Sequence, residues 1–122
     1  MGVFSHDFLA TQQTDHPLTR PHAAGGKAIA VVASTLEGDK LVQAALDGFG
    51  SLHTIICNAG ILRDKSFAPM TEKEWDAVYE THLKGTYAVA KAAWPLFQKQ
   101  RYGRIVTTSS AVGVHGNFGQ AK

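Results

Sequence analysis

Polar side chains follow two apolar segments of this chain, at the positions where β-strands would end. Asn58 and Gly60 come just after one segment, and Ser109 and Ser110 come just after the other. Amide and hydroxyl groups can hold a carbonyl or hydroxyl oxygen of a ligand by hydrogen bonds. In open α/β sheets, ligands bind beyond the carboxyl ends of the parallel strands. We therefore expect a functional site where these residues meet, provided that the two segments are parallel strands.

The two apolar segments have the pattern of buried strands. Residues 54–57 and 104–108 are short, mainly apolar runs, which favours strands that are covered on both faces. A helical pattern over residues 71–100 lies between them and begins at a capping box, in which Thr71 and Glu74 satisfy each other's free amides. A helix that connects two strands of one sheet makes those strands parallel.

The preceding part of the chain supplies a further strand and helix. Residues 27–33 are predicted to form a strand, and residues 35–49 a helix that ends at Gly50. In the helix over residues 71–100 we expect a kink at Pro95, because proline removes an amide donor and clashes with the preceding turn. A break near the start of this helix, giving a short helix and then a long one, is the alternative.

Residues 1–24 and the end of the chain give weaker signals. We interpret residues 1–24 as an irregular N-terminal segment, either a loop or a frayed short helix. Its histidines, His6, His16 and His22, have neither helical spacing nor cysteine partners, so we expect no metal site there. After residue 108 we expect a glycine-rich loop and no further regular element.

The composition is that of one domain of an ordinary soluble protein. The chain has 122 residues, of which 44% are apolar and 18% charged, and its net charge is +2. This charge gives no support to nucleic-acid binding, and no apolar run approaches the ~18 residues of a membrane helix. The single cysteine, Cys57, excludes an intramolecular disulfide and is predicted to be buried. We see neither a secretory signal nor a C-terminal peroxisomal Ser-Lys-Leu address.

Three interpretations of the polar residues near the end of the chain compete. The glycines at 113, 116 and 119 could form a phosphate-binding loop, but their spacing matches neither the dinucleotide-binding nor the Walker pattern. Ser110 could be a nucleophile with His115 as its base, but the chain has no G-x-S-x-G elbow. In the third interpretation, Ser110 donates a hydrogen bond to a substrate oxygen beside a nicotinamide.

The third interpretation agrees with a resemblance to a known family. From about residue 25 to residue 121, the sequence resembles the short-chain dehydrogenase/reductase family. The matching motifs are Cys57-Asn58-Ala59-Gly60, Trp75-Asp76, His82-Leu83-Lys84-Gly85, Gly103-Arg104-Ile105-Val106, Ser109-Ser110-Ala111-Val112-Gly113 and Gly116-Asn117-Phe118-Gly119-Gln120-Ala121. Within the family, the sequence is most similar to the (3R)-hydroxyacyl-CoA dehydrogenase unit of peroxisomal multifunctional β-oxidation enzymes, and next to bacterial 3-oxoacyl-carrier-protein reductases.

The resemblance implies a fold, a reaction and a set of site residues. The fold would be an incomplete Rossmann-like, doubly wound parallel α/β sheet of about three strands with flanking helices, formed by residues 25–122. The reaction would be hydride transfer between NAD or NADP and a 3-hydroxyacyl or 3-oxoacyl thioester. The site residues would be Ser110 on the substrate oxygen, His82 in the proton-relay position usually held by asparagine, and Asn58, Ala59 and Gly60 on the cofactor side.

Three motifs of the family have no counterpart in these 122 residues. They are the N-terminal glycine-rich loop, an acidic residue at the position of Ala33-Ser34, and the Tyr-x-x-x-Lys pair, which would begin one position beyond Lys122. We therefore expect a fragment that is inactive alone, because the tyrosine is the proton donor. With two strands of the family's sheet missing, we expect the strand over residues 27–33 to lie directly beside the strand over residues 54–57.

A different class of function is an interaction module. The helix over residues 71–100 resembles the one through which these enzymes pair their subunits, so the chain could associate with itself or with an intact homologue. The resemblance implies a peroxisomal location, and a cytoplasmic one is expected if the fragment acts alone.

Overall fold

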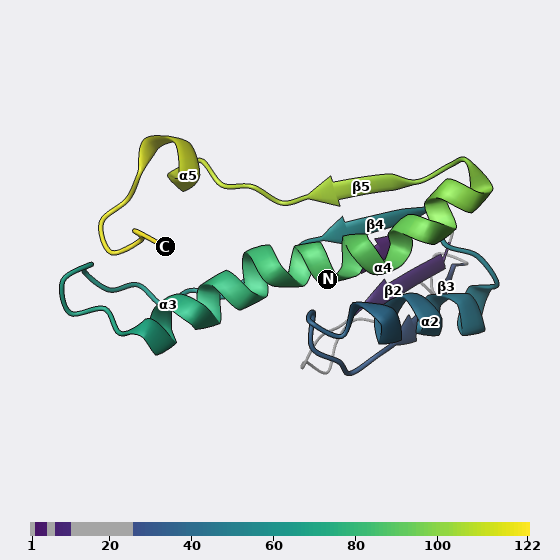
Figure 1. Ribbon diagram of the computed structural model, residues 1–122, viewed down its shortest axis with the longest axis horizontal. Helices are drawn as coiled ribbons and strands as arrows, with labels where there is room; N and C mark the ends of the chain where they lie inside the picture. The colour runs from purple at the N-terminus through teal and green to yellow at the C-terminus, as the bar shows by residue number, and fades with distance from the viewer. Residues whose placement is uncertain (1, 5–6, 11–25) are drawn as a thin grey trace.

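The computed structural model describes residues 2–4, 7–10 and 26–122 (Figure 1). Its elements in chain order are β1 (Gly2–Phe4), β2 (Asp7–Ala10), β3 (Lys27–Ala30), α2 (Gly38–Phe49), β4 (Thr54–Cys57), α3 (Glu72–Tyr79), the π-helical turn η1 (Glu80–Lys84), α4 (Gly85–Gln100), β5 (Arg104–Thr107) and α5 (Val112–His115). Among the described residues, no helix is both long enough and apolar enough to cross a membrane.

The two segments that precede the polar residues are parallel neighbours. β4 pairs with β5 in parallel, with Ile55 opposite Ile105 and Cys57 opposite Thr107. The ladder continues past the strands, because the amide of Thr108 donates to the carbonyl of Cys57 at 3.1 Å. The predicted arrangement of these two strands, joined by a helical crossover, is therefore confirmed.

The position predicted for the strand near residue 29 is wrong. The sheet has the order β3-β2-β1-β4-β5, so two strands of the N-terminal segment separate β3 from β4. β1 is antiparallel to both β2 and β4, whereas β2 is parallel to β3. Residues 2–4 and 7–10 are thus strands and not the loop or frayed helix that we expected. β1 pairs with the side of β4 that would otherwise be an open edge, and β2 links β1 to β3.

The core lies where α2, α4 and β4 meet. Its fully buried side chains include Leu41 of α2, Ile55 of β4 and Val89 of α4, with Leu52 just before β4. α2 and α4 pack directly against each other, and both lie toward the viewer in Figure 1. Cys57 belongs to this core, as predicted.

β5 is not the buried strand that the sequence predicted. All four of its residues are exposed, because β5 is the edge strand of the sheet and, within the described residues, packs chiefly against β4. Residues 104–107 form the predicted strand, but the prediction that both faces of this strand are covered is wrong.

The long helical rod across Figure 1 consists of α3, η1 and α4. It begins at the predicted capping box, where the Glu74 amide donates to Thr71 Oγ1 at 3.3 Å and the Thr71 amide donates to Glu74 Oε2 at 2.8 Å. The rod changes from α- to π-helical hydrogen bonding at Glu80–Lys84, and α4 then continues through Pro95. The predicted alternative, a short helix followed by a long one, describes this rod better than one uniform helix does.

The end of α2 was predicted from the sequence, whereas the short helix α5 was not. α2 ends at Gly50, which has φ = 74° and donates its amide to the Leu46 carbonyl at 2.8 Å. Glycine adopts this left-handed conformation without steric cost. α5 was not predicted, because four residues interrupted by Gly113 carry no recognisable helical period.

Candidate active site

A mainly apolar cleft lies beyond the carboxyl ends of β4 and β5. Its walls are the loop after β4, the helical rod near η1 and the segment around α5, and its volume is about 440 Å³. Such a shape, with a few polar groups on apolar walls, is typical of a site for a small molecule. The lining residues are Ile61, Leu62, Arg63, Asp64, Trp75, Val78, Tyr79, His82, Leu83, Ser110, Val112, Gly113, Gln120 and Lys122.

His82 lies in the cleft wall, in the middle of the π-helical turn η1. Its Nε2 atom is 3.0 Å from the backbone nitrogen and 2.9 Å from the backbone oxygen of Ile61. The His82 carbonyl accepts a hydrogen bond from Thr86 Oγ1 at 2.7 Å. Single π-helical turns occur frequently at functional sites, and this one holds His82 toward the loop after β4.

Ser110 lines the same cleft, opposite the helical rod. Its Oγ atom accepts a hydrogen bond from the Val112 amide at 3.3 Å, at the start of α5. A serine hydroxyl has one donor and two acceptor sites, so this bond leaves the O–H of Ser110 for a ligand. The two residues that we proposed for chemistry, Ser110 and His82, therefore share one cavity.

The three residues that we proposed for the cofactor side divide between two places. Asn58 lies at the sheet edge, where its Oδ1 accepts a hydrogen bond from Thr108 Oγ1 at 2.7 Å. Ala59 follows it, and neither residue lines the cleft. Gly60 lies against His82, since a methyl group added at Gly60 would be 2.8 Å from His82 Cε1.

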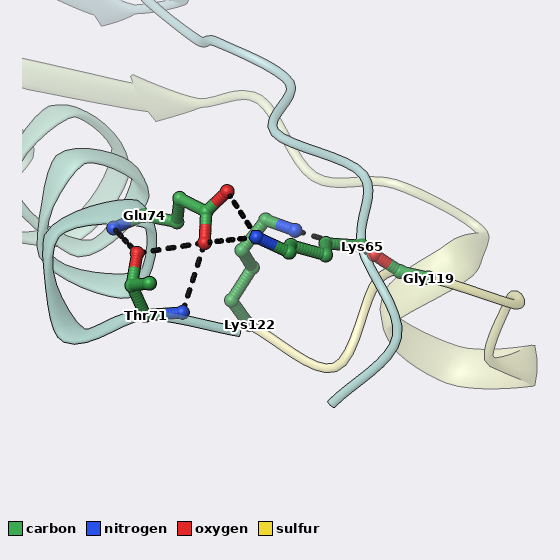
Figure 2. A network of polar contacts seen from close by, with 5 residues as sticks. All are labelled: Lys65, Thr71, Glu74, Gly119 and Lys122. Carbon is green, nitrogen blue, oxygen red and sulfur yellow. Dashed lines mark hydrogen bonds and ion pairs between the residues drawn. The ribbon is translucent and has the colours of Figure 1, made fainter. Parts of the chain in front are cut away.

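A network of hydrogen bonds holds the rim of the cleft (Figure 2). Lys65 Nζ contacts both carboxylate oxygens of Glu74, at 2.9 and 3.0 Å, and the Lys65 amide donates to the Gly119 carbonyl at 2.9 Å. Lys122 Nζ donates to the same carbonyl at 3.2 Å. Hydrogen bonds from Thr71, and then the contact with Lys65, lower the pKa of Glu74 to about 2, so Glu74 is ionised at neutral pH.

A second bridge across the rim joins Gln120 to Asp64. The Gln120 side-chain amide donates to both carboxylate oxygens of Asp64, at 3.0 and 3.1 Å. The contacts of Lys65 with Gly119 and of Asp64 with Gln120 were not predicted, because each joins residues more than fifty positions apart. The Lys65–Glu74 pair is nine positions apart but joins a loop to a helix. Only the capping box at Thr71 and Glu74 was a visible local signal.

The other two interpretations of the C-terminal residues receive no support. His115 does not line the cleft, and no hydrogen bond joins it to Ser110 in the part of the chain that the structure describes. Gly116 and Gly119 have φ values of 74° and 76°, which explains these glycines as turn residues.

One Tyr-x-x-x-Lys pattern does occur in the chain, at Tyr87 and Lys91. Lys91 Nζ donates to Tyr87 Oη at 2.9 Å, and this hydrogen bond raises the pKa of Lys91. Both residues are on α4, however, and neither lines the cleft. This pair is therefore not placed to donate a proton to a molecule bound there.

Cys57 adds no chemistry to the site, and the described residues offer no metal site. Burial is the main cause that raises the pKa of the Cys57 thiol, as expected for an unreactive core cysteine. Residues 2–4, 7–10 and 26–122 contain no cluster of His, Cys, Asp or Glu side chains suited to a metal ion. His6, His16 and His22 lie outside the described residues.

A helical crossover between parallel strands, with a cleft at their carboxyl ends, defines a Rossmann-like α/β protein. The family model described as "short chain dehydrogenase" matches residues 12–122. The chain belongs to the short-chain dehydrogenase family, a group of oxidoreductases that generally bind NAD(H) or NADP(H).

Individual relatives cover nearly the whole chain. It is 52% identical over 120 residues to peroxisomal multifunctional enzyme type 2 of Mus musculus, covering 98% of this chain and 16% of that protein. It is 47% identical over 118 residues to the peroxisomal hydratase-dehydrogenase-epimerase of Neurospora crassa, covering 97% of this chain and 13% of that protein. The chain thus spans less than a fifth of either relative.

Solved structures show the same fold. A short chain dehydrogenase from Mycobacterium avium superposes with a TM-score of 0.76 at 38% sequence identity, covering 84% of this chain and 39% of that one. The Rossmann-like fold class predicted from the sequence is therefore confirmed. The sheet contains five described strands, however, where about three were expected.

Proposed function

We propose that this chain forms the substrate side of a dehydrogenase site that transfers hydride between NAD or NADP and a 3-hydroxyacyl or 3-oxoacyl thioester. The observation that carries the proposal is that Ser110 and His82 line one apolar cleft at the carboxyl ends of the parallel strands. The name of a 3-oxoacyl-[acyl-carrier-protein] reductase of Synechocystis, 41% identical over 102 residues, supports the substrate class. The names of the two peroxisomal relatives support a peroxisomal location.

Ser110 and the apolar walls have separate roles in this proposal. The Ser110 hydroxyl donates a hydrogen bond to the oxygen on carbon 3 of the substrate and stabilises the charge that develops there. The acyl chain packs against Trp75, Val78 and Leu83, which excludes water from the reacting carbon. His82 passes a proton between the cleft and its surroundings.

The cofactor side is formed by Asn58, Ala59 and Gly60. The hydrogen bond from Thr108 uses the oxygen of the Asn58 side chain, so its two N–H donors suit an acceptor of a bound nucleotide. Ala59 and Gly60 add little bulk at this edge. The nicotinamide, when bound, supplies or accepts the hydride, and the protein provides orientation and charge stabilisation.

We further propose that the 122-residue chain binds acyl thioesters without turning them over. Among the residues described as lining the cleft, none forms the Tyr-x-x-x-Lys pair that donates the proton in this family. NADH consumption with acetoacetyl-CoA should therefore equal that of a Ser110→Ala control. Consumption clearly above this control would contradict the proposed inactivity.

Binding can be measured separately, because Trp75 lines the cleft and Trp94 does not. In a Trp94→Phe variant, 3-hydroxyoctanoyl-CoA should change the fluorescence of Trp75 saturably. Ser110→Ala should weaken this binding by about threefold to tenfold, the effect of one hydrogen bond. The matched control is Trp75→Phe, whose remaining Trp94 should not respond. If the fluorescence of Trp75 did not respond, the proposal that the cleft binds the acyl chain would be contradicted.

Self-association is a second candidate function, supported by a stripe of exposed side chains on the helical rod. Trp75, Tyr79, Leu83 and Tyr87 recur every four residues, and Trp94 extends the stripe along α4. The first three also line the cleft, so a partner would contact chiefly Tyr87 and Trp94. Residues spaced in this way lie on one helix face, and an apolar face of this kind marks an interaction surface. We propose that a second copy of the chain, or an intact homologue, packs there.

Light scattering tests this second proposal. The wild-type chain should be a dimer or larger, and Tyr87→Ser combined with Trp94→Ser should shift it to a monomer, because both residues lie outside the cleft. Thioester binding, followed by the fluorescence of Trp75, should be unchanged in this double variant. A wild-type monomer that captures no intact homologue would contradict the proposal.

A further inference from the structure

We propose that Gly60 is a positioning residue for His82, in addition to any role on the cofactor side. The proposal rests on the proposed function of His82 in the cleft. Because Gly60 has no side chain, the imidazole ring of His82 has the space to reach the backbone of Ile61.

The first observation is the close approach of the two residues. A methyl group added at Gly60 would lie 2.8 Å from His82 Cε1, 3.4 Å from Nε2 and 3.5 Å from Nδ1. The edge of the ring that carries both nitrogens therefore faces Gly60. Carbon atoms do not approach to 2.8 Å without repulsion, since their optimal separation is about 3.5–4.0 Å. Any larger residue at position 60 must push the ring away.

The second observation is that the backbone at position 60 does not itself require glycine. The glycines with positive φ are Gly50, Gly116 and Gly119, and Gly60 is not among them. The backbone conformation at position 60 is one that any L-residue can adopt, so it gives no reason for glycine. Space for His82 is the remaining reason that the described structure offers.

The third observation concerns what the ring does in this position. Nε2 lies within hydrogen-bonding distance of both the amide and the carbonyl of Ile61. A neutral ring with its proton on Nδ1 accepts from the Ile61 amide, and a ring protonated on Nε2 donates to the Ile61 carbonyl. His82 thus keeps a hydrogen bond to Ile61 in either tautomer of the ring. Displacement of the ring would remove this anchor.

The direct test is NMR spectroscopy of the full chain. In Gly60→Ala, the signals of the His82 ring nitrogens and of the Ile61 amide should shift, and the Ile61 amide should exchange with solvent about tenfold faster, because it loses one hydrogen bond. Adding His82→Asn to this variant should restore protection of the Ile61 amide, since the smaller carboxamide fits beside a methyl group. Gly113→Ala is the control, because a methyl group there meets nothing within 4 Å.

A double-mutant cycle keeps the proposal testable if Gly60→Ala is poorly folded. Gly60→Ala should lower the urea midpoint strongly when His82 is present and little in a His82→Ala background. Equal shifts in both backgrounds, or unchanged His82 and Ile61 signals in a folded Gly60→Ala variant, would overturn the proposal. These measurements use no acyl thioester, so their failure is distinct from a failure of the fluorescence assay for the proposed function.

Discussion

Replacing Gly38 by alanine should destabilise the protein by about 3 kcal/mol or more, although alanine is the better helix former by about 1 kcal/mol. Gly38 is buried at the start of α2, where the helix touches the backbone of α4. An added methyl group would overlap the carbonyl oxygen of Ala88 and lie 2.6 Å from its carbonyl carbon and 2.9 Å from the Val89 nitrogen. Backbone atoms within a helix cannot rotate away, so the two helices must separate. Urea unfolding followed by circular dichroism measures the loss.

The same helix provides a matched control in Gly48→Ala. A methyl group at Gly48 would meet only the Cδ1 end of the Ile29 side chain, which can change its rotamer. The gain in helix propensity offsets part of that adjustment, and we expect a stability within about 1 kcal/mol of the wild type. If Gly38→Ala were as stable as Gly48→Ala, the close packing of α2 on α4 would be disproved.

Truncation of Ile55 to alanine should destabilise the protein by about 2–5 kcal/mol. Ile55 is 0% exposed and belongs to the core formed by α2, α4 and β4. Alanine would leave a cavity that neighbours on three elements cannot all collapse to fill. The measurement is again the free energy of unfolding in urea.

Ile105 is the matched control, because it is paired directly with Ile55 but is 39% exposed. Ile105→Ala should cost less, about 1–2 kcal/mol, since the side chain is partly exposed already and no closed cavity forms. Equal effects of the two substitutions would mean that β5 is covered in solution. In that case the exposed outer strand described above would be part of an interface.

The features predicted correctly from the sequence depend on residues close together in the chain. The capping box needs only Thr71 and Glu74, and the end of α2 needs only Gly50 after an amphipathic pattern. β4 was predicted with its observed bounds, because a short apolar run that ends in Asn58 leaves few alternatives. Ser110 and His82 were named as site residues through the resemblance to a family and not from spacing; both line the cleft, and their roles there stay predictions.

The features that the sequence did not predict depend on distant partners. Whether an apolar strand such as β5 is buried depends on which elements cover it, and periodicity cannot supply that. Residues 2–4 and 7–10 are too short and irregular in pattern to predict strands alone. Residues 2–4 pair with the edge that β4 offers, and residues 7–10 then pair with residues 2–4 and with β3. The contact between Gly60 and His82 joins positions 22 apart through a π-helical turn, which has no sequence signature.

The bridges across the cleft rim also bear on the order of folding. Asp64 and Gln120 are 56 residues apart in the chain, whereas the capping box and the helices form from neighbours. Closing so long a loop carries an entropic cost, which exposed polar bridges offset less than the buried apolar contacts of the core do. We therefore expect the rod and the core to form first and the rim to assemble last. By the same reasoning the rim should be the first region to open in the native state. The walls of the cleft should then open and close locally while the core remains folded.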